Sequence, residues 1–135
     1  MPRSLYVNLP VKDLERTVDF FTALGFAFNP MFTDENATCM IVNDGTSVML
    51  LVESYFATFT KKPLADAHAV TETLLALSLD SRAEVDDFIA KALAKGAVEY
   101  AEPKDLGFMY QRGIADLDGH QWEVFFMDES QMPGA

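Results

Sequence analysis

The chain has 135 residues, of which 50% are hydrophobic and 12% aromatic, with one cysteine and a formal net charge of −11 at pH 7. This length and composition predict one folded domain and exclude a disordered chain. No apolar run could span a bilayer, no signal-peptide pattern follows Met1, and Cys39 alone forms no internal disulfide, so we expect a soluble cytoplasmic protein. The negative charge argues against nucleic acid and anionic membranes as partners.

The sequence opens with a predicted strand and a predicted helix. Residues 4–11 alternate between apolar side chains at odd positions and a second set, which includes Tyr6 and Asn8, at even positions. This alternation is typical of a strand with two different faces. Asp13 is a suitable N-cap for the amphipathic helix that follows, and Gly25 is a suitable end for it.

Three more strands are predicted in the first half of the chain. They cover residues 27–33, 37–43 and 46–53, separated by turn-forming Asp, Asn and Gly residues. The segment 54–72 fits no strand pattern and joins the two halves as an insertion. Three roles are expected for this segment as alternatives: a lid over a ligand cavity, an arm that packs on a partner subunit, or a plain surface helix.

The second half of the chain repeats this order of elements. A strand begins after residue 73, and Ser81 and Glu84 form a capping-box pattern before a helix that ends at Gly96. The inner stripe of this helix is predicted to contain Val85, Phe88, Ile89, Ala92 and Leu93. Further strands are predicted near residues 98–102, 107–115 and 120–126. A duplicated unit of this kind tends to fold around its copy, so that two sheets enclose a cavity.

Two motifs at opposite ends of the chain resemble those of a known superfamily. They are Val11-Lys12-Asp13-Leu14-Glu15-Arg16, with Leu24-Gly25-Phe26 after the helix, and Asp116-Leu117-Asp118-Gly119-His120-Gln121-Trp122-Glu123-Val124. Both are similar to the vicinal oxygen chelate superfamily of glyoxalase I, extradiol dioxygenases, fosfomycin-resistance transferases and bleomycin-resistance proteins. The resemblance implies an α+β fold of two βαβββ modules, residues 4–53 and 73–127, that form a cup-shaped mixed sheet. It also implies a homodimer, because two chains often complete each cup.

The resemblance further implies where a metal ion would bind. The ligand positions of the superfamily's metal enzymes fall on Tyr6, Met49, Leu74 and Glu123. Only Glu123 carries an ordinary ligand for a divalent transition metal, because thioether and leucine side chains cannot replace imidazole or carboxylate. We therefore expect no metal ion and no other cofactor.

Strand parity predicts an apolar cavity face with a few polar groups, which is typical of a small-molecule site. The residues expected on it are Tyr6, Asn8, Met49, Glu53, Leu74 and Ser78. The alternative is that these side chains simply fill the cavity. Alternation places Glu123 on the same face as Gln121, and we take Glu123 as the candidate catalytic residue and Gln121 and Arg112 as further ligand-binding candidates. Alternatively, Glu123 forms a structural ion pair with Arg112.

Three other reactive side chains are assigned structural roles. His120 follows Asp118-Gly119 in a tight turn, and His68 lies in the insertion, where an exposed side chain is expected. Cys39 lies in a predicted strand with no basic residue beside it, which favours a buried, inert thiol over a nucleophile.

Two classes of function fit these features. The first is a protein of the bleomycin-resistance kind that binds a small organic molecule in an apolar cup without a metal. The second is a metal-dependent lyase or dioxygenase of the same superfamily that uses Glu123 with His120, Tyr6 or Glu53. An enzyme with Glu123 as general base and no metal is a third alternative. The incomplete ligand set favours the first class, because metal catalysis needs a full set of ligands.

Overall fold

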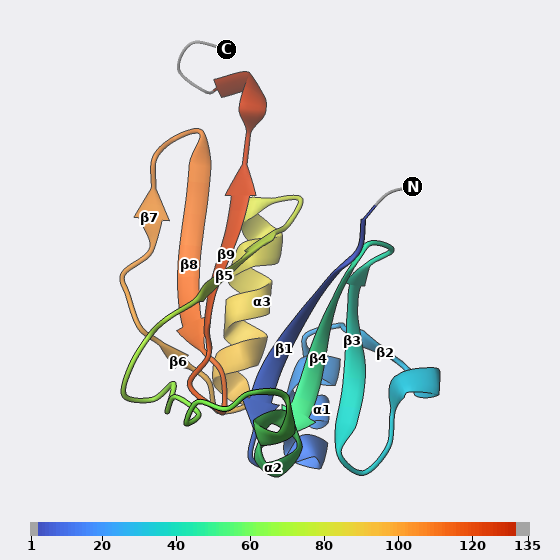
Figure 1. Ribbon diagram of the computed structural model, residues 1–135. Helices are drawn as coiled ribbons and strands as arrows, with labels where there is room; N and C mark the ends of the chain where they lie inside the picture. Colours follow the sequence, from blue (N-terminus) through green and yellow to red (C-terminus); the bar gives the residue numbers. More distant parts are fainter. Residues whose placement is uncertain (1–2, 132–135) are drawn as a thin grey trace. The chain divides into compact units, whose positions relative to one another are not determined.

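The computed structural model describes residues 3–131, which divide into two compact units between Ala65 and Asp66 (Figure 1). Each unit contains one mixed β-sheet and one main helix. The predicted α+β class with two βαβββ modules is therefore confirmed. No helix among the described residues is long and apolar enough to cross a membrane.

The first unit contains the strand and helix predicted at the start of the chain. Its elements are β1 (Leu5–Val11), α1 (Leu14–Ala23), β2 (Ala27–Asn29), β3 (Ala37–Asn43) and β4 (Thr46–Val52). The sheet order is β1-β4-β3-β2, with β1 parallel to β4 and the other pairs antiparallel. The Asp13 side chain accepts a hydrogen bond from Arg16 N (3.2 Å), and Gly25 ends the helix region with a φ of 98°. Both predicted ends of α1 are confirmed.

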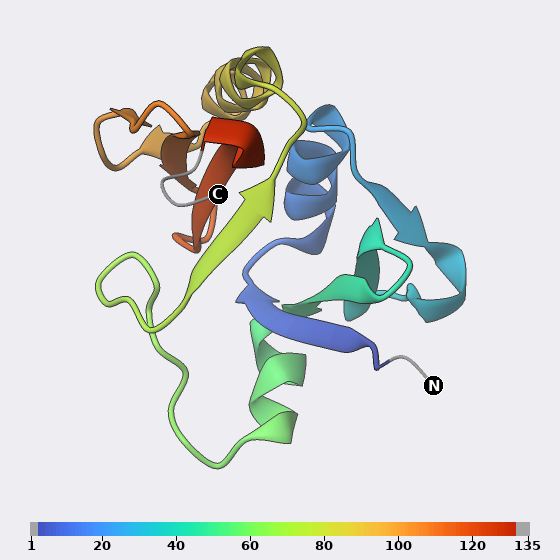
Figure 2. The ribbon, with the colours of Figure 1, turned by 90° about the horizontal axis from the view of Figure 1, so that it is seen from above.

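The core of the first unit lies between α1 and one face of its sheet (Figure 2). Phe20 and Phe21 of α1 are buried and meet edge to face, with ring centroids 4.9 Å apart. Val11 and Leu50 are also buried, whereas Tyr6, at an even position of β1, is 55% exposed. The alternation of β1 thus separates a packed face from an open one, as the sequence predicts.

Two predicted strands of the first unit end earlier than expected. The strand expected over 27–33 stops at Asn29, and Pro30–Phe32 form a 3₁₀ turn, because Pro30 has no N–H for the sheet and the Asn29 side chain accepts from Met31 N (3.0 Å). The strand expected over 46–53 stops at Val52, and Glu53–Phe56 form the short helix α2, followed by a 3₁₀ turn over Ala57–Phe59. The prediction that Glu53 lies in the strand is wrong: it is an exposed residue at a helix start, where a carboxylate is favourable.

The second unit repeats this plan with one additional short strand. Its elements are β5 (Leu74–Ser78), α3 (Arg82–Ala94), β6 (Val98–Glu99), β7 (Lys104–Asp105), β8 (Met109–Ala115), β9 (Gln121–Met127) and a 3₁₀ turn over Glu129–Gln131. The sheet order is β5-β9-β8-β6, with β7 also pairing with β8, and β5 runs parallel to β9. Ser81 Oγ accepts from Glu84 N (3.1 Å) and Glu84 Oε2 from Asp80 N (3.0 Å), so the predicted cap of α3 is formed.

The core of the second unit lies between α3 and the sheet face that carries Ile114, Trp122 and Val124. Four of the five residues predicted for the inner stripe of α3 are buried. Leu93 is 40% exposed, so its assignment to the core is wrong, because the buried positions Val85, Ile89 and Ala92 place it at the border of the stripe. β7 was not expected from the sequence, and β8 begins at Met109 because the preceding turn is held by a hydrogen bond from Gly107 N to Asp105 Oδ1 (3.0 Å).

A buried aspartate closes the turn between β8 and β9. Asp116 is 6% exposed; its Oδ1 accepts from Asp118 N and His120 N at 3.0 Å each, and its Oδ2 accepts from Trp122 Nε1 at 3.0 Å. Burial raises the pKa of Asp116, and the nearby His120 and the Trp122 N–H act in the opposite direction. Both carboxylate oxygens are therefore needed as acceptors.

We predict that Asp116→Asn lowers the free energy of unfolding by about 1–3 kcal/mol, because an amide offers one acceptor oxygen and turns its NH₂ group toward a donor. Urea unfolding measures this change. Asp34→Asn is the matched control: only Oδ1 of Asp34 accepts, from Asn36 N (2.8 Å) and Ala37 N (3.1 Å), so an amide can replace it. Equal losses in the two variants would contradict this account.

Candidate functional site

The face of the second sheet opposite α3 carries the candidate site. The pairing registers place Gly113 of β8 opposite Glu123 of β9, and Glu123 opposite Ala76 of β5. Tyr100, just beyond β6, continues this row, since its N–H bonds to Gly113 O (3.3 Å). Glu123 thus stands between two small residues in its row, and the Tyr100 ring occupies the space above one of them, Gly113.

A hollow of about 80 Å³ lies at this end of the row. It is lined by Tyr100, Ala101, Glu102, Lys104, Gln111, Arg112, Gly113 and Glu123. The volume suits a few water molecules or one functional group of a ligand, whereas pockets for whole drug-sized ligands are several times larger. The hollow can therefore recognise one part of a molecule that lies on the open face.

The Tyr100 side chain covers Gly113. A Cβ atom at Gly113 would lie 2.6 Å from Tyr100 Cζ and 2.7 Å from its hydroxyl oxygen, so only glycine permits this close approach. The hydroxyl group is buried and has no hydrogen-bond partner among the residues described. The pKa of Tyr100 is raised chiefly by burial and also by the negative charge of Glu123, so the hydroxyl stays protonated at neutral pH.

The Glu123 carboxylate is partly exposed and makes no hydrogen bond or ion pair with the described part of the chain. The alternative of an ion pair with Arg112 is wrong. Arg112 pairs with Val124 in the sheet register, so its side chain points to the α3 face while that of Glu123 points to the open face.

The Arg112 guanidinium is engaged on the α3 face. Its Nε and Nη2 each donate to Glu99 at 2.9 Å, and its Nη1 donates to Asp86 Oδ1 at 2.9 Å. These bonds, chiefly that to Glu99, raise the pKa of Arg112 above its ordinary value. The prediction that Arg112 binds a ligand finds no support in this geometry: the residue lines the hollow, but its charged group is used within the fold.

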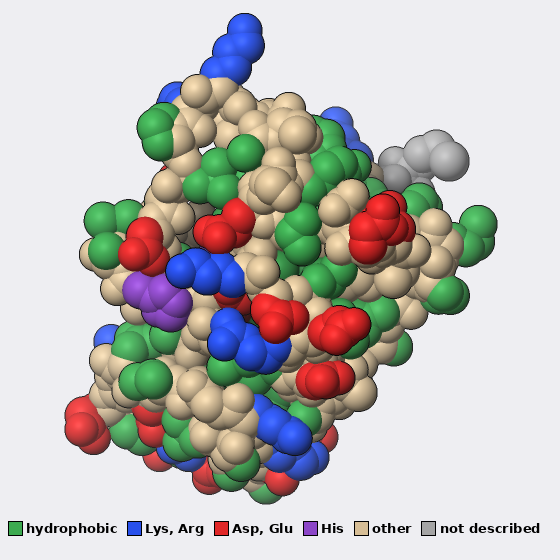
Figure 3. Space-filling model, turned by 90° about the horizontal axis from the view of Figure 1, so that it is seen from below, with side chains coloured by type: hydrophobic (Ala, Val, Ile, Leu, Met, Phe, Trp, Pro, Cys, Tyr) green, Lys and Arg blue, Asp and Glu red, His purple; other side chains and the backbone are tan. Residues whose placement is uncertain are grey.

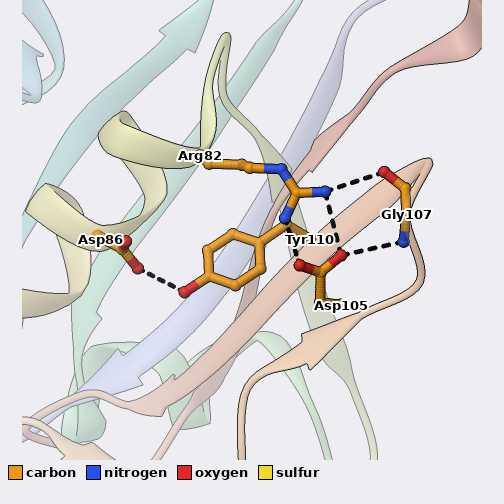
Figure 4. A network of polar contacts seen from close by, with 5 residues as sticks. All are labelled: Arg82, Asp86, Asp105, Gly107 and Tyr110. Carbon is orange, nitrogen blue, oxygen red and sulfur yellow. Dashed lines mark hydrogen bonds and ion pairs between the residues drawn. The ribbon is translucent and has the colours of Figure 1, made fainter.

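A second polar network fixes the segment that leads from β7 to β8 (Figure 4). Arg82 donates two hydrogen bonds to Asp105 (2.7 and 3.0 Å) and one to Gly107 O (2.9 Å). Its guanidinium lies 5.3 Å from the ring centroid of Tyr110, whose hydroxyl donates to Asp86 (2.6 Å). The pKa of Asp86 is lowered chiefly by the hydrogen bond from the Tyr110 hydroxyl and also by the hydrogen bond from Arg112. This network anchors β7, which carries Lys104 to the hollow.

Most of the predicted site residues lie on open sheet faces. In the second unit, Leu74 pairs with Gln121 and Ser78 with Phe125, which brings Leu74, Ser78 and Gln121 to the face of Glu123. Gln121 Oε1 accepts from Thr71 Oγ1 (2.8 Å). In the first unit, Tyr6, Asn8 and Met49 share the face opposite α1, since Asn8 pairs with Met49. Glu53 belongs to α2 and not to that face.

The donor set on these faces does not fit a metal ion. Within residues 3–131, no three His, Cys, Asp or Glu side chains lie close enough together to hold one. Around Glu123 the lining of the hollow offers a phenol, an amide, the carboxylate of Glu102 and the ammonium group of Lys104, but no imidazole and no thiolate for a divalent transition metal. His68 is exposed and Cys39 is buried, as the sequence predicts.

Tyr100 was missed at the level of sequence, although a signal for it exists. Gly113 interrupts an otherwise regular strand, and an isolated strand glycine often marks a close approach of another group.

The excess of acidic residues gives no continuous patch on the face shown in Figure 3, where acidic, basic and hydrophobic side chains are interspersed.

Comparison with known proteins identifies the same fold. Residues 3–43 match the family described as bleomycin resistance protein-like N-terminal. Hypothetical protein SA1046 from S. aureus is 28% identical over 93% of this chain and 95% of its own, with a TM-score of 0.79. A glyoxalase-related enzyme from Fulvimarina pelagi is 20% identical, with 93% and 88% coverage and a TM-score of 0.78. No curated protein matches the sequence.

A glyoxalase/bleomycin resistance protein/dioxygenase from Nocardioides is 24% identical, with a TM-score of 0.72 over 100% of this chain and 89% of its own. At these identities, the solved structures establish the fold and not the reaction. The match over residues 3–43 and the paired βαβββ modules shared with these structures show the glyoxalase/bleomycin resistance protein/dioxygenase fold, and they support the resemblance of this chain to the vicinal oxygen chelate superfamily.

Proposed function

We propose that this protein binds a small organic molecule, uncharged or cationic, on the open face of its second sheet, with Glu123 as the polar anchor and without a metal ion. The single observation that carries this proposal is the state of the Glu123 carboxylate. It is partly buried, flanked by Gly113 and Ala76, and has no hydrogen-bond or ion-pair partner in residues 3–131. A partly buried carboxylate gains most from a ligand that donates to it.

The rest of the face supports binding of an organic molecule. Leu74 is 50% exposed, and Phe125 lies partly exposed beside Glu123 in the same strand. Apolar surface around a few polar groups is the usual composition of a ligand site. The formal charge of −11 favours cationic or neutral ligands over anionic ones.

A metal-dependent lyase or dioxygenase is the second candidate. It is favoured by the position of Glu123, which falls where the superfamily's metal enzymes have a carboxylate ligand. The lining of the hollow adds only the carboxylate of Glu102 and no imidazole, and the described residues contain no group of three His, Cys, Asp or Glu side chains that could hold a metal ion, which is why we rank this candidate below metal-free binding.

We predict that Glu123→Gln weakens binding of a ligand found by thermal-shift screening by about 1–3 kcal/mol, the range for losing a charge-assisted hydrogen bond. Isothermal titration calorimetry measures the affinity. The melting temperature of the free protein should change little, because Glu123 has no hydrogen-bond or ion-pair partner to lose among the described residues.

Glu99→Gln is the matched control on the other face. It should lower the free energy of unfolding by about 1–3 kcal/mol, because it breaks the bidentate pair with Arg112. A Glu123→Gln variant that unfolds as early as Glu99→Gln, with ligand affinity unchanged, would refute the proposal. A stoichiometric transition metal in the purified protein that is lost in Glu123→Gln would favour the metal enzyme.

The homodimer and the cytoplasmic location remain predictions. The edge strands β1 and β5 carry the exposed residues Leu5 (60%) and Leu74 (50%), which supports an interface along one of these edges. We predict that multi-angle light scattering gives twice the chain mass of 15.0 kDa. A monomer at all concentrations tested would exclude the dimer.

A further inference from the structure

The hollow beside Glu123 is lined by a residue with a hydrogen-bond donor, Tyr100, and by one with an acceptor, Glu123. The Tyr100 hydroxyl is buried without a partner, and its ring tip lies over Gly113, the residue that pairs with Glu123 across the two strands. The Glu123 carboxylate accepts only. A group that lies between them must therefore accept from the phenol and donate to the carboxylate.

We infer that this hollow is a subsite for a hydroxyl group of the ligand, and that Tyr100 is the residue that selects it. This inference rests on the proposed function and specifies the ligand chemistry. A hydroxyl both accepts and donates, so it satisfies Tyr100 and Glu123 together, and the volume of about 80 Å³ suits a group of this size.

Three other functional groups cannot form hydrogen bonds with both Tyr100 and Glu123. An ammonium group donates to Glu123 but cannot accept the Tyr100 proton, which leaves that donor unpaired. A carboxylate accepts from Tyr100 but meets the like charges of Glu123 and Glu102, which outnumber the single charge of Lys104. Arg112 contributes no free charge, since its guanidinium is engaged by Glu99 and Asp86. A methyl group leaves both polar groups without a partner.

The geometry makes Gly113 essential to the subsite. Any side chain at position 113 would overlap the Tyr100 ring and force the ring out of its present position. Gly113→Ala should therefore abolish the selection of hydroxyl groups even though Tyr100 is still present. Tyr100→Phe keeps the ring and removes only the donor.

The proximity of Tyr100 to Glu123 can be measured without a ligand. We predict that Glu123→Gln moves the pKa of Tyr100 down toward the ordinary value of 10.0, because the negative neighbour that opposes phenolate formation is gone. NMR of the tyrosine ring carbons as a function of pH measures it. The pKa of Tyr110, raised chiefly by its bond to Asp86, is the internal control and should not move. An unchanged Tyr100 pKa would place the two groups too far apart to share a ligand.

The decisive experiment compares four probes with one ring and different substituents: benzyl alcohol, benzylamine, benzoate and toluene. Titrations followed by ¹H–¹⁵N correlation spectra report binding at the amides of Gly113, Glu123 and Phe125. We expect benzyl alcohol to bind most tightly at these amides. Tyr100→Phe should weaken it by about threefold to tenfold, the value of one neutral hydrogen bond, and leave toluene unchanged. Tyr110→Phe makes the same chemical change on the α3 face and should have no effect.

The outcomes separate this inference from the proposed function. Tightest binding by benzylamine or benzoate, or equal loss of benzyl alcohol in Tyr100→Phe and Tyr110→Phe, would overturn the hydroxyl subsite while binding on the open face stands. Equal affinity for all four probes would do the same. No response of these amides to any probe, with the wild-type spectrum intact, would overturn the proposed function as well.

Discussion

The bidentate ion pair between Arg112 and Glu99 determines what the rest of the second sheet can do. It lies on the α3 face, with both side chains mostly buried, at 19% and 22% exposure, and Asp86 adds a third hydrogen bond. Paired, hydrogen-bonded charges of this kind are costly to separate. Arg112 is therefore held away from the open face, one residue along the pleat from Gly113. As a consequence, Glu123 has no guanidinium partner within its own unit.

The two faces of the second sheet consequently have different properties. The α3 face combines a closed apolar core around Ile114 and Trp122 with satisfied polar networks at its margin. The open face has small residues at Ala76 and Gly113, and it has a carboxylate and a buried phenol that find no hydrogen-bond partner within residues 3–131. Unsatisfied polar groups of this kind lower stability unless they serve another purpose, and they occur preferentially at functional sites. This contrast is the physical basis for assigning ligand binding to the open face.

Local features of this fold could be predicted from the sequence. Strand alternation depends only on the pleat, so the faces of Tyr6, Leu74 and Glu123 follow from residue parity. The helix caps at Asp13 and Ser81 depend on neighbours a few residues away, and both are formed. Long-range partners could not be predicted. Arg112 bonds to residues 13 and 26 positions away, and nothing in the sequence distinguishes Glu99 and Asp86 from Glu123 as its partner.

The remaining differences have local causes that compete with strand periodicity. Strand β2 ends at Asn29 because the Asn29 side chain caps the following turn and Pro30 has no N–H for the sheet. Glu53 begins helix α2, although alternation alone would extend strand β4 to this residue. Tyr100 could be placed only once the pairing of β8 was known, because its role depends on the glycine opposite it. Such sites are defined by cross-strand neighbours, which a single sequence does not specify.

A pair of double-mutant cycles tests the central claim most directly, because it asks which carboxylate Arg112 interacts with. Unfolding free energies would be measured for Arg112→Met combined with Glu99→Gln, and for Arg112→Met combined with Glu123→Gln. The account predicts a coupling energy of about 1–3 kcal/mol for Arg112 with Glu99 and a value near zero for Arg112 with Glu123. A coupling with Glu123 as large as that with Glu99 would contradict it.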